Sequence, residues 1–162
     1  MQEIPVNCIF DKGITGCGGT ELALSNNKNT IIAMPYVSLV QNKVLQEKHK
    51  DKVLGVYGKV AQEDIEHYLL THGVKKIALT YDSLPRFINT CEAFNIDVFN
   101  TFFLLVDEWH ILFNSYVFRK DAITNLLNLA SKFKEVTYMT ATPIEEKYML
   151  KELKHLPITE II

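Results

Sequence analysis

The sequence predicts an α/β fold in which a parallel β-sheet carries helices on both of its faces. Short apolar segments alternate along the chain with longer segments of helical periodicity, the order that parallel strands joined by crossover helices require. Two apolar runs, residues 30–34 and 102–106, lack polar alternation, as strands that are covered on both faces do. A glycine-rich segment separates the first expected strand from the first expected helix.

Each expected strand is a short apolar run that ends at a glycine, a proline or a polar residue. The expected strands are residues 6–10, 30–34, 53–57, 76–80, 102–106 and 136–139. The expected helices place apolar residues on one face, as Val37, Val40 and Val44 do in the second of them. These helices are residues 20–25, 38–49, 61–72, 82–91, 121–133 and 144–156. Gly73 is expected to end the third helix, whereas residues 94–100 show no clear pattern.

Length and composition indicate one soluble globular domain, residues 1–162, with a core large enough to fold alone. The net charge of −2 excludes a general electrostatic attraction to nucleic acid, so any such contact must come from a local surface. Three widely spaced cysteines form neither a zinc pattern nor a disulfide framework, which fits a reducing cytoplasm. No apolar run has membrane-spanning length and no signal peptide is visible, so we expect a cytoplasmic protein without a membrane contact.

The glycine-rich segment, residues 13–20, has the composition of a phosphate-binding loop. Its glycines allow a tight turn in which successive N–H groups point inward, and the following helix start adds a partial positive charge. The pattern G-x-x-x-x-G-K-[ST] is matched at Gly13, Gly18 and Thr20. Gly19 stands where the pattern has its lysine. The cation could instead come from Lys12, directly before the loop, although a Lys12 that faces solvent at the strand end is the simpler interpretation.

Other chemically capable residues follow the ends of expected strands, where ligands of such sheets bind. Asp107 and Glu108 follow the most apolar strand, where a buried charge is costly unless it is used or paired. In a phosphate-binding sheet the first acid can hold Mg²⁺, and the second can orient the attacking water. Solvated turn carboxylates are the simpler interpretation of an isolated pair, but the preceding glycine loop makes it the weaker one here. His110 carries little information alone, and Trp109 is expected to pack.

Taken together and in this order, the segments resemble the first RecA-like domain of superfamily-two helicases of the DEAD/DEAH-box kind, a P-loop NTPase domain. The resemblance covers nearly the whole chain and rests on five motifs. They are motif I at Thr15-Gly16-Cys17-Gly18-Gly19-Thr20, motif Ia at residues 35–41, a nucleic-acid motif at residues 80–84, motif II at residues 106–110 and motif III at Thr140-Ala141-Thr142. Tyr36 replaces the threonine of motif Ia, and Trp109 replaces the small third residue of motif II.

The resemblance implies a role for each matching position. Backbone amides of Gly16 to Thr20 would hold the phosphates of ATP, Thr20 and Asp107 would hold Mg²⁺, and Glu108 would orient the hydrolytic water. His110 and the hydroxyls of Thr140 and Thr142 would couple the nucleotide to motion. Backbone contacts to a single strand of DNA or RNA would come from Pro35, Tyr36, Gln41, Thr80 and Tyr81.

Departures from the family leave three functions open. Gly19 removes the lysine that neutralises the terminal phosphates, and the second RecA-like domain, with its arginine finger, is absent from this chain. The chain is therefore expected to be the N-terminal ATP-binding domain of a helicase or translocase, completed by a second RecA-like domain in cis or in trans and nearly inactive alone. The alternative is a degenerate helicase-like module that binds nucleic acid or protein without hydrolysis, and other phosphate-loop proteins such as packaging ATPases are a third, weaker possibility.

Overall fold

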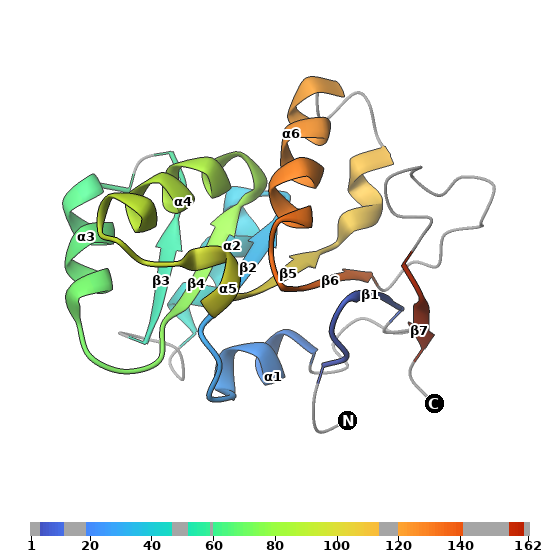
Figure 1. Cartoon of the computed structure of the whole chain (residues 1–162), viewed down its shortest axis with the longest axis horizontal. Coiled ribbons are helices and arrows are strands. Elements are labelled where there is room, and N and C mark those ends of the chain that lie inside the picture. The colour runs from blue at the N-terminus through green and yellow to red at the C-terminus, as the bar shows by residue number, and fades with distance from the viewer. Residues whose placement is uncertain are drawn as a thin grey trace.

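The part of the chain that the structure describes is built on a β-sheet of seven strands, all parallel (Figure 1). The computed structural model describes residues 4–11, 19–46, 52–58, 60–113, 120–140 and 156–160. The strand order across the sheet is β3-β4-β2-β5-β6-β1-β7. The strands are β1 Cys8–Asp11, β2 Thr30–Met34, β3 Val53–Val56, β4 Lys76–Thr80, β5 Phe103–Asp107, β6 Glu135–Thr140 and β7 Ile158–Glu160.

Helices cover both faces of this sheet, so the predicted α/β architecture is confirmed. One face carries α1 Gly19–Ser25 and α2 Val37–Leu45, and the other carries α3 Gln62–Leu70, α4 Leu84–Ala93, α5 Val98–Thr101 and α6 Lys120–Ser131. In Figure 1, α1 lies on the opposite side of the sheet from α4 and α6. Two 3₁₀ segments, η2 Tyr81–Ser83 and η3 Trp109–Phe113, follow the ends of β4 and β5.

The core is divided by the sheet into two apolar layers. Successive residues of β2 alternate between them: Ile31 packs among the helices α3 to α6, whereas Ile32 packs beneath α1 and α2. Leu104 and Leu105 divide in the same way on β5. All five residues of β2 and of β5 are buried, which explains why their sequences show no polar alternation.

Several predicted elements differ from the observed ones. The strands at residues 30–34 and 76–80 have the predicted bounds, but the helix predicted from residue 82 is η2 followed by α4. Strand β7 was not predicted, and residues 144–155 of the last predicted helix lie outside the described residues. Val37 is 42% exposed rather than part of the inner face of α2. Gly73 does have the positive φ (101°) of a chain reversal, but α3 ends earlier, with Thr71 as its C-cap residue.

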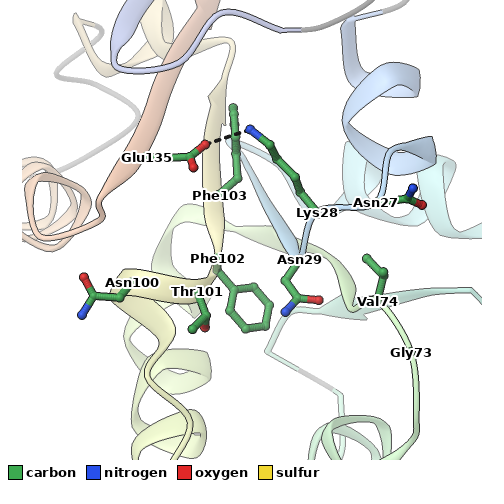
Figure 2. Close-up of a pocket in the computed structure, with 10 residues that line it drawn as sticks. All are labelled: Asn27, Lys28, Asn29, Gly73, Val74, Asn100, Thr101, Phe102, Phe103 and Glu135. Carbon is green, nitrogen blue, oxygen red and sulfur yellow. Dashed lines mark hydrogen bonds and ion pairs between the residues drawn. The ribbon is translucent and has the colours of Figure 1, made fainter.

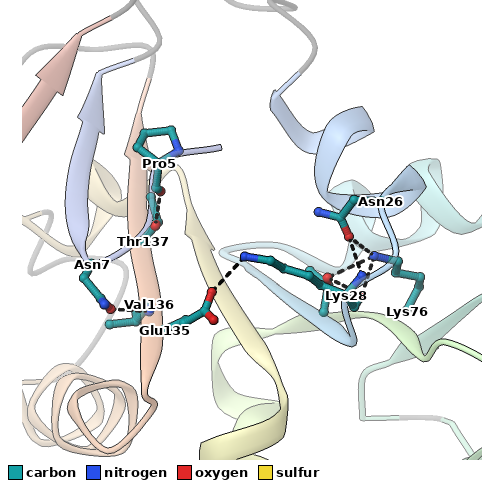
Figure 3. Close-up of polar contacts among 9 residues, drawn as sticks. Pro5, Asn7, Asn26, Lys28, Lys76, Glu135, Val136 and Thr137 are labelled. Carbon is teal, nitrogen blue, oxygen red and sulfur yellow. Dashed lines mark hydrogen bonds and ion pairs between the residues drawn. The ribbon is translucent and has the colours of Figure 1, made fainter. Parts of the chain in front are cut away.

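Polar contacts hold the segment before β1 and the loop before β2 in place (Figure 3). The Thr137 hydroxyl of β6 donates to the Pro5 carbonyl at 2.6 Å, and the Asn7 side-chain oxygen accepts the N–H of Val136 at 3.0 Å. On the next loop the Lys28 ammonium pairs with Glu135 at 2.9 Å. These contacts all lie near the amino-terminal edge of the sheet, away from the edge where the predicted site residues lie.

A buried lysine at the start of β4 binds the loop between α1 and β2. The Lys76 side chain is 5% exposed, and its ammonium has four oxygen atoms within hydrogen-bond distance. They are Ala23 O (2.7 Å), Asn26 Oδ1 (2.6 Å), Lys28 O (2.6 Å) and Thr30 Oγ1 (3.0 Å). Burial, with a smaller contribution from the nearby positive charge of Lys28, lowers the pKa of Lys76 to about 8. Lys76 thus fixes the α1–β2 loop at the cost of a buried charge.

No helix among the described residues combines the length and the apolar character that crossing a bilayer requires.

Candidate functional site at the carboxyl edge of the sheet

The predicted site residues follow strands whose carboxyl ends share one edge. The parallel register pairs Asp11 at the end of β1 with Thr140 of β6, and Asp107 at the end of β5 with Met139 of β6. Strands β1 and β5 therefore flank β6 and end at the same level, about 10 Å apart at two strand spacings. The end of β1, after which the glycine-rich sequence follows, and the acidic pair therefore lie at the same edge of the sheet, as a phosphate site between them would need.

Much of the predicted phosphate loop lies outside the described residues. This applies to Lys12, Gly13, Thr15, Gly16, Cys17 and Gly18, and also to Thr142 after β6. The two described loop positions, Gly19 and Thr20, begin helix α1, one residue before the predicted start at residue 20. Thr20 is buried, with 9% of its surface exposed.

Asp107 and Glu108 form a sharp backbone corner at the end of β5. Asp107 is the last residue of the strand and is 8% exposed. Its Oδ1 accepts the backbone N–H of Glu108 at 2.9 Å. Glu108 has a φ of +54°, in the left-handed region that non-glycine residues rarely occupy, at a cost of about 1–2 kcal/mol. Such conformations persist where neighbouring groups impose them, often at functional sites. The corner turns the chain out of the sheet immediately after the buried carboxylate.

Glu108, His110 and Thr140 meet beside this corner. The Nδ1 atom of His110 shares a hydrogen bond with the Thr140 hydroxyl at 2.7 Å and lies 3.4 Å from Oε2 of Glu108. The Glu108 and His110 side chains are both partly exposed, at 24% and 23%. A carboxylate, an imidazole and a hydroxyl from two neighbouring strand ends thus form one polar cluster open to solvent. A carboxylate in such a position can accept a proton from water.

Trp109, between these two polar residues, is buried with 1% of its surface exposed, so its predicted packing role is confirmed. Its ring turns into the layer formed with α4 and α6. The alternation of a partly exposed glutamate, a buried tryptophan and a partly exposed histidine fixes the orientation of η3. Trp109 therefore holds the corner in place by packing into this apolar layer.

The residues predicted to contact nucleic acid follow the ends of β2 and β4, at the same edge. Tyr36, with 41% of its surface exposed, and Gln41 present their side chains to solvent, whereas Pro35 is buried. Thr80 and Tyr81 are also buried, at 3% and 5% exposed, so their side chains face protein rather than solvent. Only the exposed members of this set can offer side chains to a ligand in this conformation.

The Tyr81 hydroxyl has a partner that spacing along the chain could not reveal. It donates a hydrogen bond to the backbone carbonyl oxygen of Asp107. Burial raises the pKa of Tyr81 well above its usual value, and the nearby Asp107, Glu108 and Tyr36 groups add to that rise. The hydroxyl therefore keeps its proton and remains a donor. Tyr81 links the segment predicted to contact nucleic acid to the acidic corner.

Magnesium would find suitable donors at this edge. Mg²⁺ prefers hard oxygen ligands and commonly takes one or two from the protein and the rest from phosphate and water. The buried Asp107 carboxylate and the Thr20 hydroxyl are ligands of this kind. Within the described ranges, no group of three or more histidine, cysteine, aspartate or glutamate side chains could hold a metal ion by itself. The chemistry of the donors thus fits a metal that is bound mainly through a phosphate ligand.

A separate pocket of about 430 Å³ opens at the opposite, amino-terminal edge (Figure 2). It is formed by residues 27–29, 73–74 and 100–103 together with Glu135. The ion pair between Lys28 and Glu135 lies across it, and the Lys28 ammonium sits 5.6 Å from the centre of the Phe103 ring. None of the predicted site residues lines this pocket, so it is not part of the candidate site.

Comparison with known proteins supports the fold but not a closer relationship. No model of a known protein family matches the sequence, and no curated protein matches it. Among solved structures, the DUF1998 helicase MrfA bound to DNA is similar, with a TM-score of 0.58 and 16% sequence identity. The match covers 95% of this chain and 25% of that helicase, so this chain spans about a quarter of its length. This chain therefore has a helicase-like, RecA-like α/β fold.

Proposed function

We propose that this chain is the N-terminal ATP-binding domain of a superfamily-two helicase or translocase, which couples ATP hydrolysis to movement on a single strand of DNA or RNA. The observation that carries the proposal is the cluster of Glu108, His110 and Thr140 beside the buried Asp107, at the edge where β1 ends. The likeness to a helicase whose structure holds DNA supports nucleic acid as the second ligand.

In this proposal each group has one task. Backbone amides of the glycine loop bind the terminal phosphates, and Thr20 and Asp107 hold Mg²⁺, which neutralises charge on them when it is bound. Glu108 orients a water molecule for attack on the terminal phosphate and accepts its proton. His110 and Thr140 pass the presence of that phosphate to β6. A second RecA-like domain, in cis or in trans, supplies the cation that closes the site.

Gly19 is the specific observation that favours a second function, a helicase-like module that binds nucleic acid or protein without hydrolysis. A charge-assisted hydrogen bond contributes roughly 1.5–3 kcal/mol, so its loss weakens nucleotide binding by about ten- to 150-fold. Its loss costs more in the transition state, where negative charge develops on the phosphate oxygens. Lys12 at the loop start is our candidate for restoring this charge, and Lys12→Ala should then lower the affinity for ATP.

A nucleotide-binding assay tests whether Asp107 holds Mg²⁺ together with ATP. A fluorescent ATP analogue is titrated into the chain with and without Mg²⁺, in the original protein, in Asp107→Asn and in Asp121→Asn. Asp121 is an exposed acid of α6 and serves as the matched control. We expect Mg²⁺ to strengthen binding in the original protein and in the Asp121 variant, and to have little effect in the Asp107 variant. Equal Mg²⁺ effects in all three proteins would remove Asp107 from the site.

Turnover separates the two functions. Phosphate release is measured with Mg²⁺-ATP and a single-stranded oligonucleotide, for the chain alone and for the chain joined to a second RecA-like domain. Little turnover is expected from the chain alone. In the joined protein, strand-stimulated turnover that falls by roughly a hundredfold or more in Glu108→Gln supports the motor. Strand binding without turnover in either form supports the module that binds nucleic acid. If neither form binds ATP or the strand, the motor and the nucleic-acid-binding module are both overturned.

A further inference from the structure

The Tyr81 side chain spans a full strand of the sheet. Tyr81 follows β4, and Asp107 ends β5, while β2 lies between these two strands and pairs with both. The buried ring reaches past the end of β2, and its hydroxyl donates to the carbonyl oxygen of Asp107. Because that carbonyl belongs to the peptide that joins Asp107 to Glu108, the hydrogen bond acts on the acidic corner itself.

This peptide is held on both sides. Tyr81 binds its carbonyl oxygen, and the Asp107 carboxylate accepts its N–H, which belongs to Glu108, at 2.9 Å. One residue further, the Glu108 carbonyl accepts the N–H of Ile111 at 3.1 Å, which starts η3. The left-handed φ of Glu108 is therefore imposed by hydrogen bonds before and after it. Rotation of this peptide would move the Glu108 carboxylate away from the imidazole of His110.

The other end of the link is fixed in the segment after β4. The hydroxyls of Thr80 and Ser83, both buried, share a hydrogen bond of 2.8 Å that closes the turn around Tyr81. Tyr36, which is exposed, and Tyr81 follow neighbouring strands, because β2 pairs with β4 and places Met34 opposite Thr80. A ligand that contacts Tyr36 or the backbone of η2 would thus press on an element that is bonded directly to the acidic corner.

We propose that Tyr81 is a positioning residue: through its hydrogen bond to the Asp107 carbonyl it sets the direction of the Glu108 carboxylate, and it transmits single-strand binding at Tyr36 and η2 to that carboxylate. The inference rests on the proposed function for its second half. The first half, the control of the corner, holds or fails without any ligand.

Amide hydrogen exchange of the ligand-free chain, measured residue by residue by NMR, tests the first half. Tyr81→Phe removes the hydroxyl and keeps the ring, so the packing is preserved. Tyr68→Phe is the matched control, because its hydroxyl also binds backbone groups, Lys52 O at 2.8 Å and Lys76 N at 2.9 Å, at the far edge of the sheet. We expect the Glu108 amide to exchange roughly tenfold faster in Tyr81→Phe and to be unchanged in Tyr68→Phe relative to the neighbouring β5 amides. Unchanged exchange at Glu108 in the Tyr81 variant overturns the inference.

Tryptophan fluorescence tests the second half, since Trp109 is the one tryptophan of the chain and adjoins Glu108. A single-stranded oligothymidylate is added while Trp109 emission reports on the corner and the anisotropy of a dye on the oligonucleotide reports on binding. We expect binding to change the emission in the original protein and in Tyr68→Phe. In Tyr81→Phe the oligonucleotide should still bind, within about threefold in affinity, but the emission change should be lost.

The possible outcomes distinguish a failure of the inference about Tyr81 from a failure of the proposed nucleic-acid binding. Binding with the same emission change in all three proteins overturns the transmission, as does binding without a change in the original protein, while both leave nucleic-acid binding in place. If the oligonucleotide binds none of the proteins, the nucleic-acid part of the proposed function fails and the transmission fails with it. The exchange result for Glu108 then still decides whether Tyr81 positions the corner.

Discussion

Replacing Lys76 by methionine should change how the stability of this domain depends on pH. In the folded protein the Lys76 ammonium is buried among backbone and side-chain oxygens, and its pKa is lowered from 10.5 to about 8. The unfolded chain restores the higher value. Between these two pH values the unfolded state holds a proton that the folded state has lost, so stability rises with pH. Below pH 8 both states are protonated, and the full cost of the buried charge remains.

The shift sets the size of the effect. A difference of about 2.5 pKa units corresponds to about 3 kcal/mol over the whole window, and the part that falls between about pH 7.5 and about pH 10 is about 2 kcal/mol. Methionine has a similar length and does not titrate, so the variant loses this contribution. The stability of the original protein should therefore gain about 2 kcal/mol relative to the Lys76→Met variant as the pH is raised over that range.

Urea unfolding followed by circular dichroism at several pH values measures this difference. Tyrosines and cysteines titrate in the same pH range, but both proteins contain them. Their contributions to the free energy of unfolding therefore cancel when the two proteins are compared at each pH. Lys134→Met, which removes a charge from the exposed turn before β6, is the control and should give a curve parallel to that of the original protein. Parallel curves for Lys76→Met as well would show that the folded and unfolded states bind the Lys76 proton equally, and the reasoning from burial would be refuted.

Two further predictions concern packing on either face of the sheet. A methyl group added to Gly55 of β3 would meet Val44 Cγ2 of α2 at 2.9 Å, so Gly55→Ala should lower the free energy of unfolding by about 1–3 kcal/mol. Gly58, where an added methyl group meets nothing within 4 Å, is the control, and equal urea midpoints for the two variants would contradict the close approach of α2. Burial raises the pKa of the Cys91 thiol to about 12, so iodoacetamide at mildly alkaline pH should label Cys91 only after unfolding, and mass spectrometry showing rapid native labelling would disprove its burial.

The central strands could be predicted from the sequence because each is buried on both faces. Residues 30–34 and 76–80 are continuous runs closed by polar or proline residues, and the structure has the same bounds. Strand β7 could not be predicted in this way. It has three residues, pairs with β1 alone and contains Ile158, which is 55% exposed, so no apolar pattern marks it. Periodicity predicts Val37 on the inner face of α2, but Val37 is the first residue of that helix and is 42% exposed.

For the site, the sequence predicts which residues follow strand ends but not which of them touch. The pairing of His110 with Thr140 depends on β5 and β6 being neighbours, which the chain order makes plausible. The bond from Tyr81 to Asp107 depends on β4 and β5 flanking β2, an order that no local pattern encodes. The sequence also does not predict the left-handed backbone of Glu108, because such a conformation is expected at glycine and not at glutamate.

Glu108 also bears on the choice between a motor and a module without hydrolysis. A left-handed glutamate costs about 1–2 kcal/mol, a cost that glycine at this position would remove, and a buried carboxylate such as Asp107 adds a desolvation cost. Neither cost brings a benefit to a domain that only binds nucleic acid through Tyr36 and Gln41. Gly19, which stands where the phosphate-loop pattern has a lysine, forgoes by comparison roughly 1.5–3 kcal/mol of phosphate binding, which other cations can supply. The unfavourable backbone of Glu108 and the buried Asp107 carboxylate are better explained by a reaction at a bound phosphate than by nucleic-acid binding alone. This argument favours the proposed motor over the module without hydrolysis.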